Sequence, residues 1–211
     1  MPGTKSASMS GVKRKRDPST KERGETKSKS RRKSPSDDGE GEDIQSEIVQ
    51  LEAQILESRK HYNNIATLLQ RARQSDAEDE APILAAVALC RVFSRLLVTG
   101  DMVKSKGMSE AELVIVSWLK ERYRELCNVL LDDFLRSEHP PKQSVALTLV
   151  MRLVKEEAKS QKDYKIKNGP LPRLVDILLR LPLDDLNREE FAEKYLKQFD
   201  DIRYQTFQTI K

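Results

Sequence analysis

The sequence predicts an all-α protein, built as a HEAT-like or armadillo-like stack of antiparallel helix pairs and preceded by a disordered basic tail. Apolar residues recur with helical spacing from residue 44 to 211, and no segment alternates apolar and polar residues as a strand would. Some expected helices are apolar all round and others on one side only, as in stacked helix pairs. No strict repeat period is visible, so a compact irregular bundle stays an alternative.

The segment from Pro82 to Val98 (PILAAVALCRVFSRLLV) is expected to form the central helix of the domain. Proline is favoured in the first turn of a helix. The polar residues that follow it are Arg91, Ser94 and Arg95, which form one narrow stripe. The run is shorter than the roughly twenty apolar residues that span a bilayer, and arginine interrupts it. We therefore expect a core helix surrounded by other helices, and no membrane contact.

Residues 1–43 form a separate region, rich in Ser, Lys, Arg, Gly and Pro and without aromatic residues, which predicts disorder. Residues 1–36 contain 12 Lys and Arg against 3 Asp and Glu, whereas the remainder contains 26 against 31. The acidic remainder argues against a broad nucleic-acid platform on the folded part. Two basic clusters predict recognition by a nuclear import receptor or contact with RNA or DNA phosphates: Lys13, Arg14, Lys15, Arg16, and Lys27, Lys29, Arg31, Arg32, Lys33.

The predicted helical domain covers residues 44–211. One amphipathic face begins near residue 44, and another follows a break at residues 61–64; their apolar positions are Ile44, Ile48, Leu51, Ile55, Ile65, Leu68, Leu69 and Ala72. Gly100 is expected to end the central helix. Ser109 and Glu112 have the spacing of a capping box, which predicts a long helix with one apolar face down to Phe134. On that helix Lys120, Arg122 and Arg124 alternate with Glu121 and Glu125, which indicates a solvated, self-compensated face.

The C-terminal half begins with a break at residues 138–141, followed by the apolar run VALTLVMRLV (145–154), a second buried helix. A further helix starts near Pro170 and stops at Pro182. Asn187 with Glu190 has the pattern of another helix cap, and a last helix covers residues 201–210. Because no polar segment closes the chain, we expect the N-terminal part of a longer protein.

The sequence offers no reaction chemistry. Cys90 and Cys127 lie in apolar helical runs without a CxxC pair, which predicts buried, reduced thiols. There is no phosphate-binding glycine loop, no HExxH motif, and no nucleophile with a matched base. The acidic pairs at 132–133, 184–185 and 200–201 are interpreted as helix caps or solvated surface. We therefore expect no catalytic site, no cofactor, no metal and no small-molecule substrate.

Three segments carry a resemblance to a known family: LCRVFSRLLVTGDM (89–102), WLKERYRELCNVLL (118–131) and YLKQFDDIRYQTF (195–207). They resemble the N-terminal helical region of the nucleolar complex protein 4 family, a group of CCAAT-binding-factor and Mak21-like ribosome-assembly factors. The similarity covers about residues 44–211. It is strongest at Trp118, Arg122, Tyr123, Tyr195, Leu196, Asp200, Asp201, Arg203 and Tyr204.

The resemblance implies a non-catalytic scaffold of the nucleolus, working beside Nop14 in the small-subunit processome, in 40S maturation and pre-rRNA processing. If an exposed cluster near the C-terminal end docks the partner, the candidates are Arg203 and Tyr204, and packing in the core is the alternative for Tyr204. Two alternatives stay open: a nuclear factor that binds RNA or DNA directly through the basic tail, and a helical-repeat transport adaptor.

Overall fold

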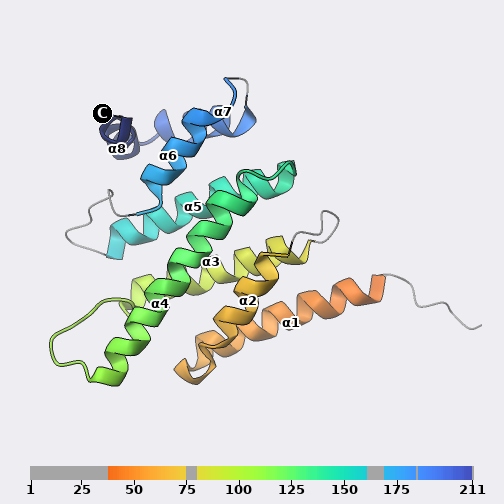
Figure 1. Ribbon diagram of the computed structural model, residues 1–211, viewed down its shortest axis with the longest axis vertical. Coiled ribbons are helices and arrows are strands. Elements are labelled where there is room, and N and C mark those ends of the chain that lie inside the picture. The colour runs from red at the N-terminus through yellow and green to blue at the C-terminus, as the bar shows by residue number, and fades with distance from the viewer. Residues whose placement is uncertain (1–37, 75–79, 161–168, 184, 211) are drawn as a thin grey trace, which may run out of the picture. The chain divides into compact units, whose positions relative to one another are not determined.

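The computed structural model describes residues 38–74, 80–160, 169–183 and 185–210, and the described residues form eight α-helices and no strand. The helices are coloured in chain order in Figure 1. Their bounds are α1 Asp38–Glu57, α2 Asn64–Ala72, α3 Ala81–Thr99, α4 Glu110–Asn128, α5 Pro140–Ser160, α6 Leu171–Arg180, α7 Leu186–Phe191 and α8 Asp200–Ile210. The predicted all-α fold is confirmed.

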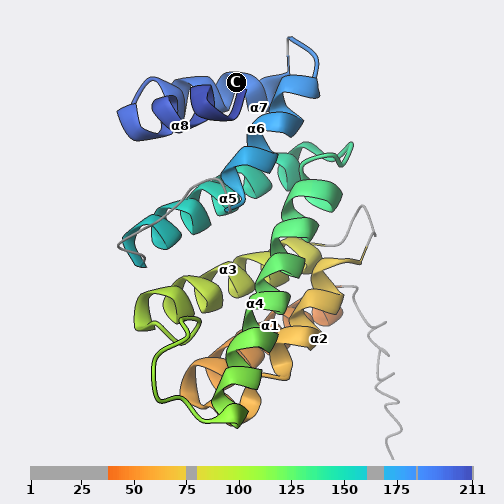
Figure 2. The same ribbon diagram turned by 60° about the vertical axis from the view of Figure 1, so that its left-hand side comes forward.

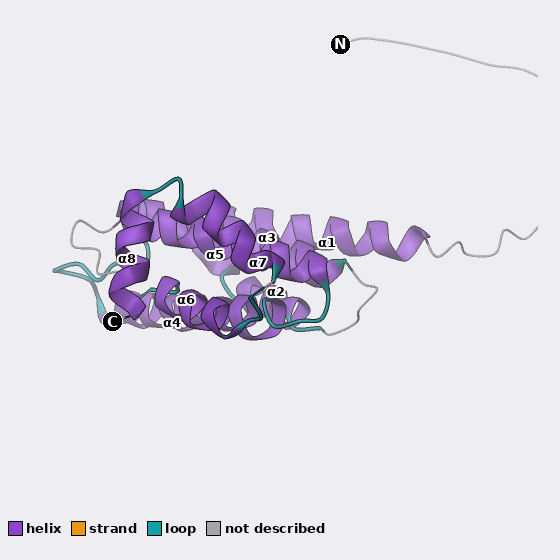
Figure 3. Ribbon diagram, turned by 90° about the horizontal axis from the view of Figure 1, so that it is seen from above, coloured by secondary structure: helices purple, strands orange, loops and turns teal. Residues whose placement is uncertain are grey.

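The helices pack in two layers. Figure 3 shows α1, α3 and α5 in one row and α2, α4 and α6 in the other. Helices of the same row contact one another, α1 with α3, α3 with α5 and α2 with α4. Contacts of α1 with α2, α3 with α4 and α5 with α6 join the two rows. Figure 2 shows α5 between α3 and α6, with α7 and α8 following. This arrangement is the stack of antiparallel helix pairs that the sequence predicts.

Helix α3 is surrounded by neighbours, since α1, α2, α4 and α5 all contact it. Of its 19 residues, 12 are buried. By length and hydropathy alone α3 would be able to cross a membrane, with a mean hydropathy of 1.9, but 67% of that stretch is buried inside the domain. Phe93 is fully buried, and its ring lies 5.4 Å from that of Tyr123 on α4. The prediction of a core helix is therefore confirmed.

Polar contacts at the rim join α1 to its neighbours. Arg91 of α3 donates two hydrogen bonds to Glu52 of α1, from Nε at 2.6 Å and from Nη2 at 2.5 Å. Arg71 of α2 donates to Glu47 of α1 at 2.5 Å. The fork of Arg91 matches the two carboxylate oxygens, so this pair fixes the orientation of α1 on α3 as well as their distance.

The end of α3 and the start of α4 have the predicted helix caps. Gly100 adopts a left-handed conformation with φ of 78°, and the N–H of Asp101 bonds to the carbonyl of Leu96 at 3.1 Å, which forms a Schellman-type cap. In the capping box at the start of α4, Ser109 Oγ accepts from the N–H of Glu112 at 3.3 Å, and the Glu112 carboxylate accepts from the N–H of Ser109 at 2.8 Å.

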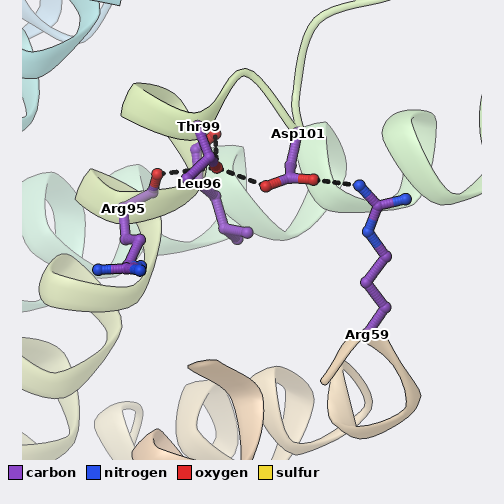
Figure 4. Close-up of polar contacts among 5 residues, drawn as sticks. All are labelled: Arg59, Arg95, Leu96, Thr99 and Asp101. Carbon is purple, nitrogen blue, oxygen red and sulfur yellow. Dashed lines mark hydrogen bonds and ion pairs between the residues drawn. The ribbon is translucent and has the colours of Figure 1, made fainter. Parts of the chain in front are cut away.

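The carboxylate of Asp101 ties the loop after α3 to the short helix η1 (Arg59–His61), as Figure 4 shows. Arg59 Nη2 donates to one carboxylate oxygen at 2.5 Å, and Thr99 Oγ1 contacts the other. Thr99 Oγ1 also lies 3.0 Å from the carbonyl oxygen of Arg95, its partner one turn earlier. The loop that leaves α3 is therefore anchored at its first residues.

Several boundaries differ from those expected. Helix α1 begins at Asp38, before residue 44, in a stretch whose sequence is rich in the acidic residues favoured at helix N-termini. The cap of α7 is Asp185, which accepts from the N–H groups of Asn187 and Arg188, so the prediction of a cap at Asn187 is wrong. A carboxylate placed two and three residues before these donors satisfies both of them.

Two helices continue as π-helical turns, which the sequence did not predict. The segment η2 (Val129–Phe134) extends α4, and η4 (Ala192–Leu196) extends α7. In η2 the side chains of Val129, Leu130, Leu131 and Phe134 are all buried, and the segment contacts α5 and α6. A π-turn is wider than an α-turn, so more consecutive side chains face the neighbouring helices.

Replacing Phe93 by alanine is expected to lower the free energy of unfolding by about 3–5 kcal/mol, because it leaves a cavity in the core around α3. The matched control is Val98→Ala on the same helix, where 66% of the side chain is exposed and the change should stay within about 0.5 kcal/mol. Chemical denaturation of both variants measures the difference. Equal losses would contradict the central position of α3.

Both cysteines are buried free thiols. Burial raises the pKa of Cys90 to about 11, and burial with the nearby charge of Glu157 raises the pKa of Cys127 to about 12. The ordinary value is near 9, so above that pH the unfolded chain releases these protons while the folded chain keeps them.

The folded state should therefore lose stability as the pH rises from about 9 towards 11–12. Each thiol contributes a loss of at most about 1.4 kcal/mol per pH unit. Urea unfolding at several alkaline pH values measures the slope, and Cys127→Ala should make it shallower. Lysines and tyrosines titrate in both proteins, so the difference between the two slopes isolates the thiol. Identical slopes would show that Cys127 is accessible to water.

Candidate docking surface

The C-terminal helix α8 packs against α6 and η4. Asp185 caps α7, and Arg188 donates to the carbonyl of Leu181 at 2.9 Å, which holds α7 against the end of α6. The rings of Phe191 and Tyr195 lie 5.9 Å apart at the junction of α7 and η4. These contacts fix the segment from which α8 starts.

One side of α8 is buried and the other exposes apolar side chains. Ile202 and Thr206, one turn apart, are 9% and 5% exposed. On the other side, about half or more of each apolar side chain is exposed, with Tyr204 at 59%. We call these residues, together with Arg203, the α8 surface: Phe199, Arg203, Tyr204, Phe207 and Ile210. Residues 199, 203, 207 and 210 recur every three or four positions, so they lie side by side along the helix.

The charge within the α8 surface is locally compensated. Arg203 forms an ion pair with Asp200, one turn earlier on the same helix. Both side chains are exposed, so this pair adds little to stability. The guanidinium remains open to a further partner, because one of its nitrogens holds the carboxylate and the group has five N–H donors.

The residues singled out from the sequence fall into two groups. Arg203 and Tyr204 lie together on α8, and the side chain of Tyr204 is exposed rather than packed in the core. The basic clusters at residues 13–16 and 27–33 lie outside the described residues. Among the residues that carry the family resemblance, Tyr123 is buried and Trp118, Tyr195 and Leu196 are packed against the core, whereas Asp200, Asp201, Arg203 and Tyr204 are exposed.

Sequence reasoning missed the exposure of Phe199, Phe207 and Ile210. A signal was present: apolar residues at 199, 202, 204, 207 and 210 are distributed around the helix, so neighbours on one side cannot bury them all. Leu183, in the connection from α6 to α7, and Leu186, the first residue of α7, are also exposed, at 89% and 74%. Large exposed apolar side chains gathered in one region are typical of docking surfaces.

The described residues offer little for reaction chemistry. They contain no group of three or more His, Cys, Asp or Glu side chains that could hold a metal ion. The pKa of Asp133 is raised by burial, but its neighbour Asp132 is engaged by Arg173 at 2.8 Å. Burial raises the pKa values of the Cys90 and Cys127 thiols further above neutral pH, so neither is activated as a thiolate.

Stacked helix pairs define a helical-repeat protein. The chain belongs to the nucleolar complex protein 4-like family: the family model "Nucleolar complex protein 4-like, TPR repeats" matches residues 36–211. An uncharacterized protein of Schizosaccharomyces pombe is 29% identical over 166 residues, which cover 78% of this chain and 34% of that protein. The chain thus spans about a third of the length of this curated relative. No solved structure matches it.

The exposure of the α8 surface leads to a stability prediction. Tyr204→Ala and Phe207→Ala should each leave the free energy of unfolding within about 0.5 kcal/mol of the parent, because water already covers most of these side chains. Ile202→Ala, on the buried side of the same helix, should cost about 2 kcal/mol. Chemical denaturation tests all three variants. A large loss for Tyr204→Ala would place that ring in the core.

Proposed function

We propose that the protein is a non-catalytic scaffold in the assembly of the small-subunit processome, and that it docks assembly proteins through its helical surfaces. Membership in the nucleolar complex protein 4-like family, which implies involvement in ribosome biogenesis, supports this role and suggests a nucleolar location. The proposed partner on the same family basis is Nop14. The observation that carries the proposal is the α8 surface, an exposed group of three aromatic rings, one isoleucine and one arginine.

The composition of the α8 surface suits a protein partner. Aromatic and arginine side chains dominate the binding energy of protein interfaces when they enter pockets from which water is excluded. Phe199, Tyr204 and Phe207 would supply apolar contact area, and Arg203 would supply hydrogen bonds to the partner. An RNA phosphate backbone would instead need an excess of positive charge, whereas Asp200 compensates Arg203.

The basic clusters of the tail are proposed to serve a different purpose. Lys13 to Arg16 and Lys27 to Lys33 have the pattern that import receptors recognise, which would bring the protein to the nucleus. The same charges favour the alternative function, direct contact of the tail with pre-rRNA or DNA. Residues 1–36 are net basic and the remainder is net acidic. We therefore assign import and nucleic-acid contact to the tail, and protein docking to the helical part.

The double variant Arg203→Ala with Tyr204→Ala should weaken binding of purified Nop14 by about tenfold or more, because both side chains are of hot-spot types. Isothermal titration of the full chain measures the affinity. The matched control is Arg95→Ala with Val98→Ala, which removes an exposed arginine and an exposed apolar side chain from α3. Unchanged affinity in the first variant would remove the α8 surface as the docking site.

If the alternative function held instead, binding to a pre-rRNA fragment would depend steeply on salt and would be lost when the nine clustered basic residues of the tail are replaced by glutamine. Nop14 binding should survive that replacement and should survive nuclease treatment. Loss of Nop14 binding with nuclease would show that RNA bridges the two proteins, and the scaffold proposal would fail.

A further inference from the structure

A groove of about 700 Å³ lies between α4, the loop after α3, the end of α5 and the start of α6. Its floor is apolar. Leu97, Met102, Tyr123 and Cys127 line it, and each of them is less than a tenth exposed. These side chains come from α3, the loop after it and α4, so the floor exists only because α3 and α4 pack together.

The rim of the groove carries positive charge. Lys120, Arg124 and Arg173 line it, and the one carboxylate that the described residues contribute to the lining, Glu157, is only 7% exposed. Arg173 is held in place, since it donates to Asn128 at 2.6 Å and to Asp132 at 2.8 Å. Lys120 and Arg124 are one turn apart on α4, so their charges point to the same side.

The sequence predicted that glutamates compensate Lys120, Arg122 and Arg124, and among the described residues the structure shows this for Arg122 alone of the three. Arg122 forms ion pairs with both nearby carboxylates, that of Glu121 at 3.2 Å and that of Glu125 at 2.8 Å. Arg73 of α2 also contacts Glu125, at 3.4 Å. Among the described ranges, Lys120 and Arg124 form no ion pair. Their charges are therefore directed at the groove without a counter-charge from α4.

The loop that supplies Met102 is not free to close the groove. Asp101, the residue before Met102, is held by Arg59 and Thr99 (Figure 4). Gly100 is fixed in its left-handed conformation by the cap of α3. The apolar floor is therefore preorganised, and a ligand would not need to order this part of the chain first.

We infer that this groove binds an acidic amphipathic segment of a partner protein, in which an apolar side chain enters the floor and two carboxylates one helical turn apart meet Lys120 and Arg124. The inference deepens the docking role and rests on it. Charge complementarity favours an acidic peptide: two cations without an ion-pair partner among the described residues, beside a buried apolar floor, match carboxylates that flank a leucine or phenylalanine. An RNA strand suits the groove less well, because the aromatic ring that the described residues contribute to its lining, Tyr123, is buried and offers no stacking face.

The test uses the full chain and a labelled model helix that places a glutamate at i and i+4 and leucines on the adjacent face. Fluorescence anisotropy should show binding that falls about tenfold or more in Lys120→Glu with Arg124→Glu. A second helix with lysine in place of glutamate should bind that charge-reversed variant and not the parent. This second helix is not attracted by the basic tail, so its gain of binding reports on the groove alone. A third helix, with alanine in place of leucine, should bind neither protein.

The matched control reverses two exposed cations that do not line the groove, Lys60→Glu with Arg95→Glu, and should leave binding unchanged. Circular dichroism confirms that each variant keeps its helix content. The inference is overturned if the acidic helix binds the parent and the Lys120/Arg124 variant equally, if no helix binds, or if only an RNA oligonucleotide responds to the charge reversal. If these helix-binding tests failed while Nop14 still bound through the α8 surface, the groove would be rejected as a binding site. The proposed function would still hold.

Discussion

Helix α3 has no continuous polar side, and its burial requires a neighbour in almost every direction. Four helices supply these neighbours: α1, α2, α4 and α5. They come from both layers, so the packing around α3 also sets the order of the helix pairs along the stack. Of the polar stripe expected along α3, Ser94 is buried, whereas Arg91 and Arg95 are exposed. Arg91 is engaged by Glu52 of α1.

The features that the sequence predicted correctly depend on residues within one or two turns of each other. Pro82 near the start of α3, Gly100 at its end and the Ser109–Glu112 box each follow from local hydrogen-bonding rules. The π-helical turns could not be predicted in this way. The segment η2 follows the same apolar pattern as α4, and its wider turn depends on contacts with α5 and α6. The two candidate caps of α7, Asp185 and Asn187, were both visible, and only the packed geometry distinguished them.

The two surfaces differ in how much of them the sequence could predict. Arg203 and Tyr204 were identified by resemblance, and the apolar residues around α8 could have predicted the exposed rings beside them. The groove could not be predicted from the sequence, because its lining comes from segments between residues 97 and 173 that meet only after folding. The interpretation of Lys120 and Arg124 as compensated was reasonable from spacing alone. It failed because Arg122 forms ion pairs with both of the neighbouring glutamates.

The fold separates the residues that stabilise it from those that are proposed to dock partners. The core around α3 excludes water, whereas the α8 surface and the groove rim contribute little to the free energy of unfolding because their side chains face solvent. The α8 surface is apolar with its charge internally paired, and the groove is cationic around an apolar floor. A single partner segment cannot complement both chemistries equally well. Two different segments, on one partner or on two, are therefore the natural ligands of a scaffold built in this way, and two segments on one partner would bind with raised effective concentration.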